Sequence, residues 1–332
     1  MKFELLKAHG SSNDIFIVDG RPERIFSTPA EVADFVRLVC DRQGPLGGDG
    51  LYFVDDSRAV PEAFFFNPDG SSAKLCGNGL RCVGRLVLER RGVDALDVST
   101  GGGRFRVERI PQVAAGVWSV AVELPPVTFR AADVPVVTTG AEHVDTVIPT
   151  LHPALRFTGV AVPNSHLVAV VDDYDENELV AVGGAAAGLP VVLPAGANVS
   201  FVRPLTTPGE IFVRTFERGA GLTPSCGSGV VASRAVYSRL GHAPADEPLL
   251  VRNPGGCARS FLTPAADGVL TPRLEGNATF VYRAVVDLEQ LAHAEPGDLD
   301  IDVLTDEISA YALFHEDNLR AIRAAGITQP ER

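Results

Sequence analysis

Two cysteines of this 332-residue chain occur in matching local settings. Cys76 and Cys226 each open a Cys-Gly-x-Gly sequence, and each follows a Phe-rich apolar run that stops at a polar residue, Asn67 or Glu217, at the same spacing. Matched thiols on a duplicated scaffold predict one active site with a thiol on each side of the substrate. Acid–base chemistry from both faces of one carbon is inversion of a stereocentre.

Each Cys-Gly-x-Gly sequence precedes a helix-like run. The N–H groups and positive dipole end of such a helix are expected to lower the pKa of a cysteine and to hold a carboxylate. The alternative, without a catalytic role, is that Cys76 and Cys226 are buried structural thiols. Cys40, Cys82 and Cys257 lack this setting and are predicted to be structural. No metal site is expected, because the Cys76–Cys82 spacing matches no common ligand pattern.

The similarity between the two halves extends beyond the cysteines. HGSSNDIFIVD near the start resembles VPNSHLVAVVDD in pattern, and the shift from Asn13 to Asn164 nearly equals the shift from Cys76 to Cys226. A near-constant shift over this distance indicates two tandem copies of one fold. We therefore expect a first domain at 1–125 with a return strand at 278–288, a second domain at 126–277, and an appendage at 289–332.

The elements that must position these residues are mostly short β runs bounded by Gly, Pro, Asn and Asp. Helical patterns are fewer. One covers 29–42 with Thr28 as the N-cap, two follow the matched cysteines, and one covers 305–325. This mixture predicts an α+β fold with strands wrapped around a few helices.

Composition and charge argue against several classes of partner for this chain. The chain is 45% hydrophobic and 21% charged, with a formal net charge of −13, which argues against nucleic acid or an anionic membrane as a partner. Glu4 interrupts the apolar stretch that a signal peptide needs, and the uncharged span 179–202 is broken by Pro190 and Pro194. We expect a cytoplasmic protein without a disulfide framework, since the cysteine count of 5 is odd.

Lysine is scarce, which bears on the cofactor. The three lysines lie in no obvious pocket motif, and a pyridoxal phosphate enzyme needs a Schiff-base lysine. Arg218 beside Glu217 is typical of a site that holds the charged groups of an amino acid. His166 belongs to the repeat, which favours a site role over a surface one.

At this point the chain resembles a known family. FNPDGSSAKLCGNGLRC and ERGAGLTPSCGSG are similar to the two signature motifs of diaminopimelate epimerase, and KAHGSSNDIFIVDG is similar to that family's N-terminal strand. PNSH at 163–166, AGANVSFV at 195–202 and GNATFVY at 276–282 resemble its later motifs, in family order. The resemblance covers about residues 1–288.

The resemblance implies a cofactor-independent isomerase with two pseudo-symmetric domains, each a set of strands around a central helix. It implies conversion of LL-2,6-diaminopimelate to the meso form, in lysine and peptidoglycan precursor biosynthesis. Cys76 and Cys226 would be the acid–base pair, tuned or deprotonated by His166 and Glu217. The substrate-binding positions would be Asn13, Asn67, Gly77, Asn78, Asn164, Asn198, Glu217, Arg218, Gly227 and Ser228.

Four departures from the family pattern bear on fine substrate preference. PNSH occurs where the family usually has Asn-Pro-His, and GNA occurs where it usually has Gly-Glu-Ala. GSSND replaces Gly-x-Gly-Asn-Asp, and Gly50 occupies a position where some members have a substrate-binding glutamine. Residues after about 288 resemble no family motif.

Two alternatives stay open. One is a related racemase of another amino acid, and the other, of a different class, is a thiol redox sensor. The sequence does not decide the oligomeric state, and a homodimer is one state that it allows.

Overall fold

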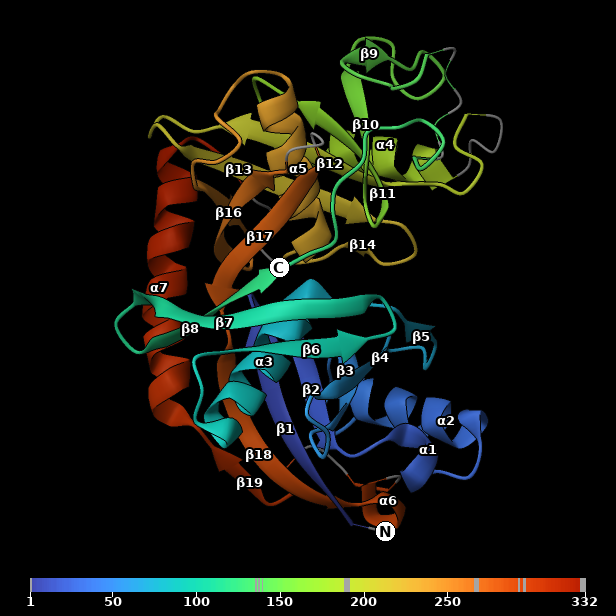
Figure 1. The fold of residues 1–332 in the computed structure, drawn as a ribbon, viewed down its shortest axis with the longest axis vertical. Coiled ribbons are helices and arrows are strands. Elements are labelled where there is room, and N and C mark those ends of the chain that lie inside the picture. Colours follow the sequence, from blue (N-terminus) through green and yellow to red (C-terminus); the bar gives the residue numbers. More distant parts are fainter. Residues whose placement is uncertain are drawn as a thin grey trace. The chain divides into compact units, whose positions relative to one another are not determined.

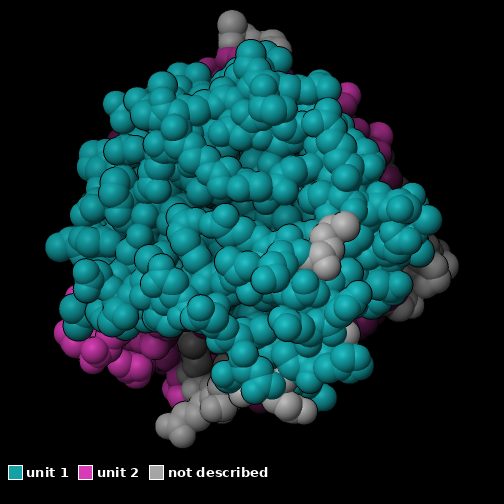
Figure 2. Space-filling model, turned by 90° about the horizontal axis from the view of Figure 1, so that it is seen from below, with its two compact units in different colours: residues 1–122, 275–314 teal, residues 123–274, 315–332 magenta. Residues whose placement is uncertain are grey.

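The computed structural model describes residues 2–328 except 135, 137, 139, 188–191, 266–268, 292, 295 and 296. The chain forms two compact units, coloured separately in Figure 2. Unit 1 comprises residues 1–122 and 275–314, and unit 2 comprises residues 123–274 and 315–332. The domain boundaries expected from the sequence stay a prediction beside this division.

Unit 1 combines the first strands of the chain with a late return of the chain (Figure 1). Its elements are β1 (Lys2–Gly10), β2 (Asn13–Asp19), α1 (Pro22–Ile25), α2 (Pro29–Cys40), β3 (Gly50–Asp55), β4 (Glu62–Phe66), β5 (Ser72–Ala73), α3 (Gly77–Arg91), β6 (Ala95–Thr100), β7 (Gly103–Ala114), β8 (Val117–Glu123, to residue 122), β18 (Thr279–Asp287), α6 (Leu288–Leu291) and β19 (Ile301–Val303). Strand β18 pairs antiparallel with β1, so a strand from the start of the sequence and a strand from its last quarter lie in one sheet.

Unit 2 contains a series of strands and a long helix that resembles the series from β1 to β7 in unit 1. Its elements are β9 (Thr146–Val147), β10 (Arg156–Val162), β11 (Asn164–Val170), α4 (Glu176–Ala187), β12 (Asn198–Pro204), β13 (Glu210–Glu217), β14 (Gly221–Leu222), α5 (Gly227–Arg239), β15 (Leu249–Asn253), β16 (Gly256–Pro264) and most of β17 (Leu270–Asn277). The unit boundary falls inside the last helix, α7 (Thr305–Ala324), with residues to 314 in unit 1 and the rest in unit 2.

The pairing order shows the duplication. In unit 1 an antiparallel hairpin β1–β2 is followed by parallel β2–β3, antiparallel β3–β4, parallel β4–β6 and antiparallel β6–β7. In unit 2 the series β10–β11, β11–β12, β12–β13, β13–β15 and β15–β16 has the same directions in the same order. The α+β fold with two pseudo-symmetric halves is therefore confirmed.

One long helix lies at the centre of the strands in each unit. Helix α3 packs against β1, β2, β3, β6 and β7, and α5 packs against β10 to β13, β15 and β16. Residues 78–88 of α3 are buried on every face, which a helix wrapped by strands requires. The helices expected after the two cysteines are thus confirmed, as is the helix α2, whose N-cap Thr28 accepts from the Glu31 N–H. Helix α4 was not expected from the sequence.

Candidate active site

Both matched cysteines are helix N-caps. Cys76 caps α3 and Cys226 caps α5, each with extended backbone dihedrals. Each Sγ accepts a backbone N–H three residues later, from Gly79 at 3.5 Å and from Gly229 at 3.4 Å. The two thiols therefore have equivalent positions at the positive ends of the two central helices.

The second glycine of each Cys-Gly-x-Gly sequence is required by packing. A Cβ at Gly79 would lie 2.8 Å from the ring of Tyr52, and a Cβ at Gly229 would lie 2.3 Å from Thr215 Oγ1. Neither distance is compatible with an ordinary side chain contact. These glycines let the first helical turn sit directly on the neighbouring strands, which holds the cysteine in place.

In unit 1, the side chains of Asn13 and Tyr52 contact Cys76. Its Sγ donates to Asn13 Oδ1 at 3.5 Å, and Asn13 is the first residue of β2. The Tyr52 hydroxyl, from β3, accepts the Cys76 N–H at 2.9 Å and donates to the Cys76 carbonyl at 3.1 Å. Tyr52 is fully buried. One phenol therefore holds both backbone groups of the capping residue.

The other predicted residues of unit 1 differ in their contacts, and among the described residues Asn67 forms no hydrogen bond with the Cys76 thiol. Asn67 follows the last residue of β4, and its Nδ2 donates to Ser71 Oγ at 3.0 Å. Gly77 opens α3. Asn78 is buried, and its Oδ1 accepts from Arg81 at 3.0 Å, inside unit 1. The side chain of Asn78 is thus engaged in the fold, and its contribution to a substrate would come from its backbone at the start of the helix.

In unit 2, a carboxylate contacts Cys226. The Cys226 Sγ donates to Glu217 Oε2 at 3.1 Å, and Thr223 Oγ1 donates to the other carboxylate oxygen. Glu217 is the last residue of β13, and Asn67 holds the matching place after β4. The two half-sites therefore differ at this point, because a titratable group stands in unit 2 where unit 1 has an amide.

His166 reaches Cys226 through a serine. Its Nε2 lies 3.0 Å from Ser228 Oγ and 3.3 Å from Asn164 Oδ1, and Ser228 Oγ lies 3.4 Å from Cys226 Sγ. His166 is fully buried in β11, and burial lowers its pKa to about 3. The imidazole is therefore neutral near pH 7, and no described residue forms a hydrogen bond with its Nδ1.

Arg218 lies at the rim of the same half-site. Its backbone N–H donates to Asn198 Oδ1 at 2.9 Å, and its guanidinium donates to the Ala195 carbonyl. A Cβ at Gly196, which has a φ of +64°, would lie 2.9 Å from the Arg218 side chain. The 195–198 segment thus contacts both the backbone and the side chain of Arg218.

The expected lowering of the thiol pKa is wrong for Cys226. Burial raises the pKa of the Cys226 thiol well above its usual value, and the Glu217 carboxylate raises it further. The contacts with Ser228 and the Gly229 N–H oppose this but are smaller. Loss of water and a nearby negative charge therefore outweigh the helix end, and Cys226 is a thiol near neutral pH.

The remaining cysteines are all buried, free thiols. Burial raises the pKa of Cys40 and Cys82 to about 12 and that of Cys257 to about 11. These values fit inert structural cysteines.

The structure thus joins Asn164, His166, Asn198, Glu217, Arg218, Cys226, Gly227 and Ser228 within unit 2, and Asn13, Gly77 and Asn78 with Cys76 within unit 1. Sequence reasoning missed Tyr52 and Thr223. A tyrosine inside an apolar strand carries no local signal of a polar role.

Among the described residues, no cluster of three or more His, Cys, Asp or Glu could hold a metal ion. None of the described helices is long and apolar enough to cross a membrane.

Sequence comparison finds relatives that share one family name. A sequence model of the family described as diaminopimelate epimerase matches residues 5–119 and 158–269. Proteins named diaminopimelate epimerase include one from Clostridium acetobutylicum, 31% identical over 95% of each chain. Another, from Ligilactobacillus salivarius, is 36% identical over 94% of this chain and 98% of its own. Because 95% of the chain is matched, the similarity reaches past residue 288, beyond the motifs that we recognised.

Solved structures share the fold at lower identity. A PhzF-family phenazine biosynthesis protein from Bacillus anthracis superposes with a TM-score of 0.63 at 16% identity, over 87% of this chain and 100% of its own. A hydroxyproline epimerase from Agrobacterium vitis gives 0.59 at 17% identity, over 86% and 93%. At such identities the likeness concerns the fold alone.

Proposed function

Since the chain belongs to the diaminopimelate epimerase family, a family of isomerases, we propose that it interconverts LL-2,6-diaminopimelate and meso-diaminopimelate by proton transfer at one α-carbon. The observation that carries this proposal is the pair of N-capping thiols, Cys76 on α3 and Cys226 on α5. The reaction uses both thiols on one substrate molecule, one for each face of the carbon.

The contacts in unit 2 support the activation of Cys226. A buried thiol needs a base, and Glu217 Oε2 is the acceptor of its hydrogen bond at 3.1 Å. Transfer of the thiol proton to Glu217 gives the thiolate and a neutral carboxylic acid, so no net charge enters this buried site. The neutral His166 acts on the thiol through Ser228 by fixing the orientation of that hydroxyl.

The thiolate then takes the α-proton, and the electron pair of the broken C–H bond stays on the substrate as a carbanion. The opposite thiol gives its proton to the other face of the carbon, so the two cysteines exchange protonation states in each turnover. The reverse reaction uses the same groups in the opposite order. Reversibility therefore follows from having a thiol at each helix end.

The carbanion needs stabilisation, and the helix ends are suited to it. The first N–H groups of a helix have no intrahelical acceptor and lie at the positive end of its dipole. Gly77 with Asn78 on α3, and Gly227 with Ser228 on α5, would bind the carboxylate of the reacting centre through these groups. Charge that moves onto this carboxylate in the transition state is then held by fixed donors.

The distal amino acid would be bound by Arg218 with Asn67, Asn164 and Asn198. Arg218 is exposed, and its side chain is braced by the 195–198 segment, so its guanidinium is already ordered for a carboxylate. A substrate without a second amino-acid end would leave this group unused. This supports diaminopimelate, and with it a place in lysine and peptidoglycan precursor synthesis. The cytoplasmic location and the absence of a cofactor stay predictions.

Proton exchange in D₂O tests the proposal. We expect the protein to incorporate deuterium at the α-carbon of LL-diaminopimelate, to form the meso isomer, and to leave proline and other amino acids unchanged. Cys76→Ala and Cys226→Ala should each abolish epimerisation. The matched control is Cys82→Ala, which removes a buried thiol on the same helix α3 and should keep activity. Full turnover by either active-site variant would contradict the two-thiol mechanism, and exchange only of another amino acid would make the protein a different racemase.

A further inference from the structure

The turn that precedes Asn13 has a strained backbone. Ser11 and Ser12 join β1 to β2 with φ values of 55° and 57°, and both are non-glycine residues in the left-handed region. Glycine adopts this region freely, whereas serine does so at a cost. Such a conformation persists only where surrounding contacts determine it.

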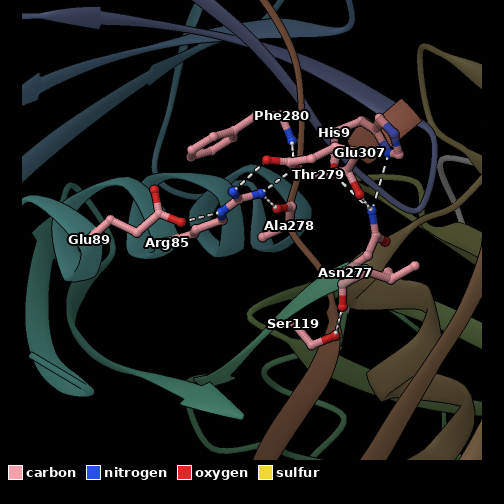
Figure 3. Close-up of polar contacts among 10 residues, drawn as sticks. His9, Arg85, Glu89, Ser119, Asn277, Ala278, Thr279, Phe280 and Glu307 are labelled. Atoms are coloured by element: carbon pink, nitrogen blue, oxygen red, sulfur yellow. Dashed lines mark hydrogen bonds and ion pairs between the residues drawn. The ribbon is translucent and has the colours of Figure 1, made fainter. Parts of the chain in front are cut away.

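Side chains of unit 1 provide several of those contacts. The Ser11 N–H donates to Asn277 Oδ1 at 2.7 Å, and the Ser12 N–H donates to His9 Nδ1 at 3.3 Å. Asn277 is fully buried and also donates to the His9 carbonyl and to Thr279 Oγ1, as Figure 3 shows. The turn is thus tied to Asn277, the last residue of β17.

The last helix adds a contact from outside the hairpin. The Tyr311 ring packs edge-on against the His9 ring with centroids 4.3 Å apart, and its hydroxyl lies 3.4 Å from Ser12 Oγ. This part of α7 is anchored by Glu307, which accepts from both terminal nitrogens of Arg85 at 2.5 and 2.7 Å (Figure 3). Glu307 also accepts the Phe280 N–H at 3.0 Å. Tyr311 is therefore presented to the turn from a fixed helix.

The same turn lies against the first turn of α3. A Cβ at Gly10 would be 2.7 Å from the Asn78 carbonyl oxygen, and Arg81 donates to Ser11 Oγ at 3.3 Å and to Asn78 Oδ1 at 3.0 Å. The residue after the turn, Asn13, accepts the hydrogen bond of the Cys76 thiol. A change in the turn would therefore move the acceptor of that thiol.

We propose that Tyr311 is a positioning residue for Cys76: it locks the strained Ser11–Ser12 turn and so holds Asn13 at the thiol. Its effect on catalysis rests on the proposed function, whereas its effect on the thiol does not. The helix that the sequence marks only as an appendage is then part of the Cys76 half-site.

Variants at Ser12 separate the lock from the hydroxyl contact. Ser12→Ala removes the hydroxyl that Tyr311 contacts and keeps the strained backbone, while Ser12→Gly removes the same hydroxyl and relieves the strain. We expect Tyr311→Phe and Ser12→Ala each to slow proton exchange by about two- to tenfold, the effect of one lost hydrogen bond. Ser12→Gly should slow it less than Ser12→Ala, and Tyr311→Phe should add little in the Ser12→Gly background.

The second measurement is alkylation by iodoacetamide in the folded protein, with each cysteine followed by peptide mass spectrometry. A thiol that donates to Asn13 is favoured in its protonated form, so loosening this contact should speed alkylation of Cys76 by about two- to tenfold. Alkylation of Cys226 should not change. Tyr237→Phe is the control, because it removes a phenol hydroxyl from α5 in unit 2 and should alter neither rate.

The outcomes are distinct. If Tyr311→Leu lowers the melting temperature but leaves Cys76 alkylation as in the parent, α7 serves stability alone and the proposal is overturned. Equal effects of Ser12→Ala and Ser12→Gly would also overturn it. If the parent exchanges no α-proton at all, the proposed function fails, and the alkylation rates still decide the role of Tyr311.

Discussion

At the scale of residues, the two half-sites share geometry and differ in chemistry. Both thiols cap a helix, but Cys226 faces Glu217 and Cys76 faces Asn13. The carboxylate supplies a proton acceptor in unit 2, whereas unit 1 supplies an amide and the Tyr52 hydroxyl. The pair is therefore asymmetric although the folds match.

Tyr52→Phe tests the clamp on the Cys76 backbone. The ring stays in the core, and the hydroxyl that contacts both the N–H and the carbonyl of Cys76 is lost. We expect a loss of stability of about 1–3 kcal/mol from the unsatisfied N–H, and proton exchange at least several-fold slower. Urea denaturation and exchange in D₂O measure the two effects. Tyr237→Phe on α5 is the control, and the same loss of activity in both variants would refute a specific clamp.

His166 makes stability depend on pH. Its folded-state pKa is about 3, well below the usual value, so the unfolded chain binds a proton that the folded chain does not. The free energy of unfolding should therefore fall as pH drops from about 6.5 toward 3, by about 3 kcal/mol at pH 4 from this residue.

His166→Gln removes this titration. Denaturant melts at pH 6.5 and pH 4 should show a smaller loss for the variant than for the parent, with carboxylate titration common to both. An equal loss in the two proteins would mean that folding does not lower the pKa of His166.

At the scale of elements, the contact between helix α4 and a neighbouring strand bears on the position of Glu217. Helix α4 packs against β13, which ends at Glu217. Two adjacent glycines of α4, Gly183 and Gly184, have different surroundings. A Cβ at Gly183 would lie 2.3 Å from the Phe216 ring, while a Cβ at Gly184 would meet nothing within 4 Å.

Alanine at these two positions should act with opposite sign. Gly183→Ala should destabilise by about 1–3 kcal/mol through overpacking against Phe216, and activity should fall because Glu217 is the next residue. Gly184→Ala should stabilise by about 0.5–1 kcal/mol, because alanine favours the helix. Equilibrium unfolding and proton exchange check both, and a stabilised Gly183→Ala variant would contradict the close packing.

At the scale of the whole molecule, helix α7 contributes residues to both units. Within unit 1, the buried Arg85 lies over the Phe280 ring at 3.8 Å and pairs with Glu307 of α7. Within unit 2, the buried Asn318 of α7 donates to the Asn253 carbonyl, and Asn253 donates to Ser225, the residue before Cys226. Helix α7 therefore makes buried contacts within each unit, and the role of 289–332 as an appendage stays a prediction.

Glu307→Gln tests the buried contact of α7 in unit 1. It leaves the buried Arg85 without its full counter-charge, and we expect a loss of about 2–4 kcal/mol in unfolding free energy. The control is Glu316→Gln on the same helix, whose pair with Arg320 is exposed and should contribute less than about 0.5 kcal/mol. Denaturation midpoints measure both. Similar small effects would show that α7 is dispensable for the fold.

The sequence by itself determined the duplication, the α+β class, the family, and a helix directly after each of the two cysteines. These features are local or repeat at a constant shift, so patterns of glycine, apolar spacing and capping express them. Only the tertiary structure decided that Cys226 is a raised-pKa thiol, that Tyr52 clamps Cys76, and that Tyr311 meets Ser12. Each of these depends on burial or on partners far apart in the chain, and no local pattern encodes which side chains pack together.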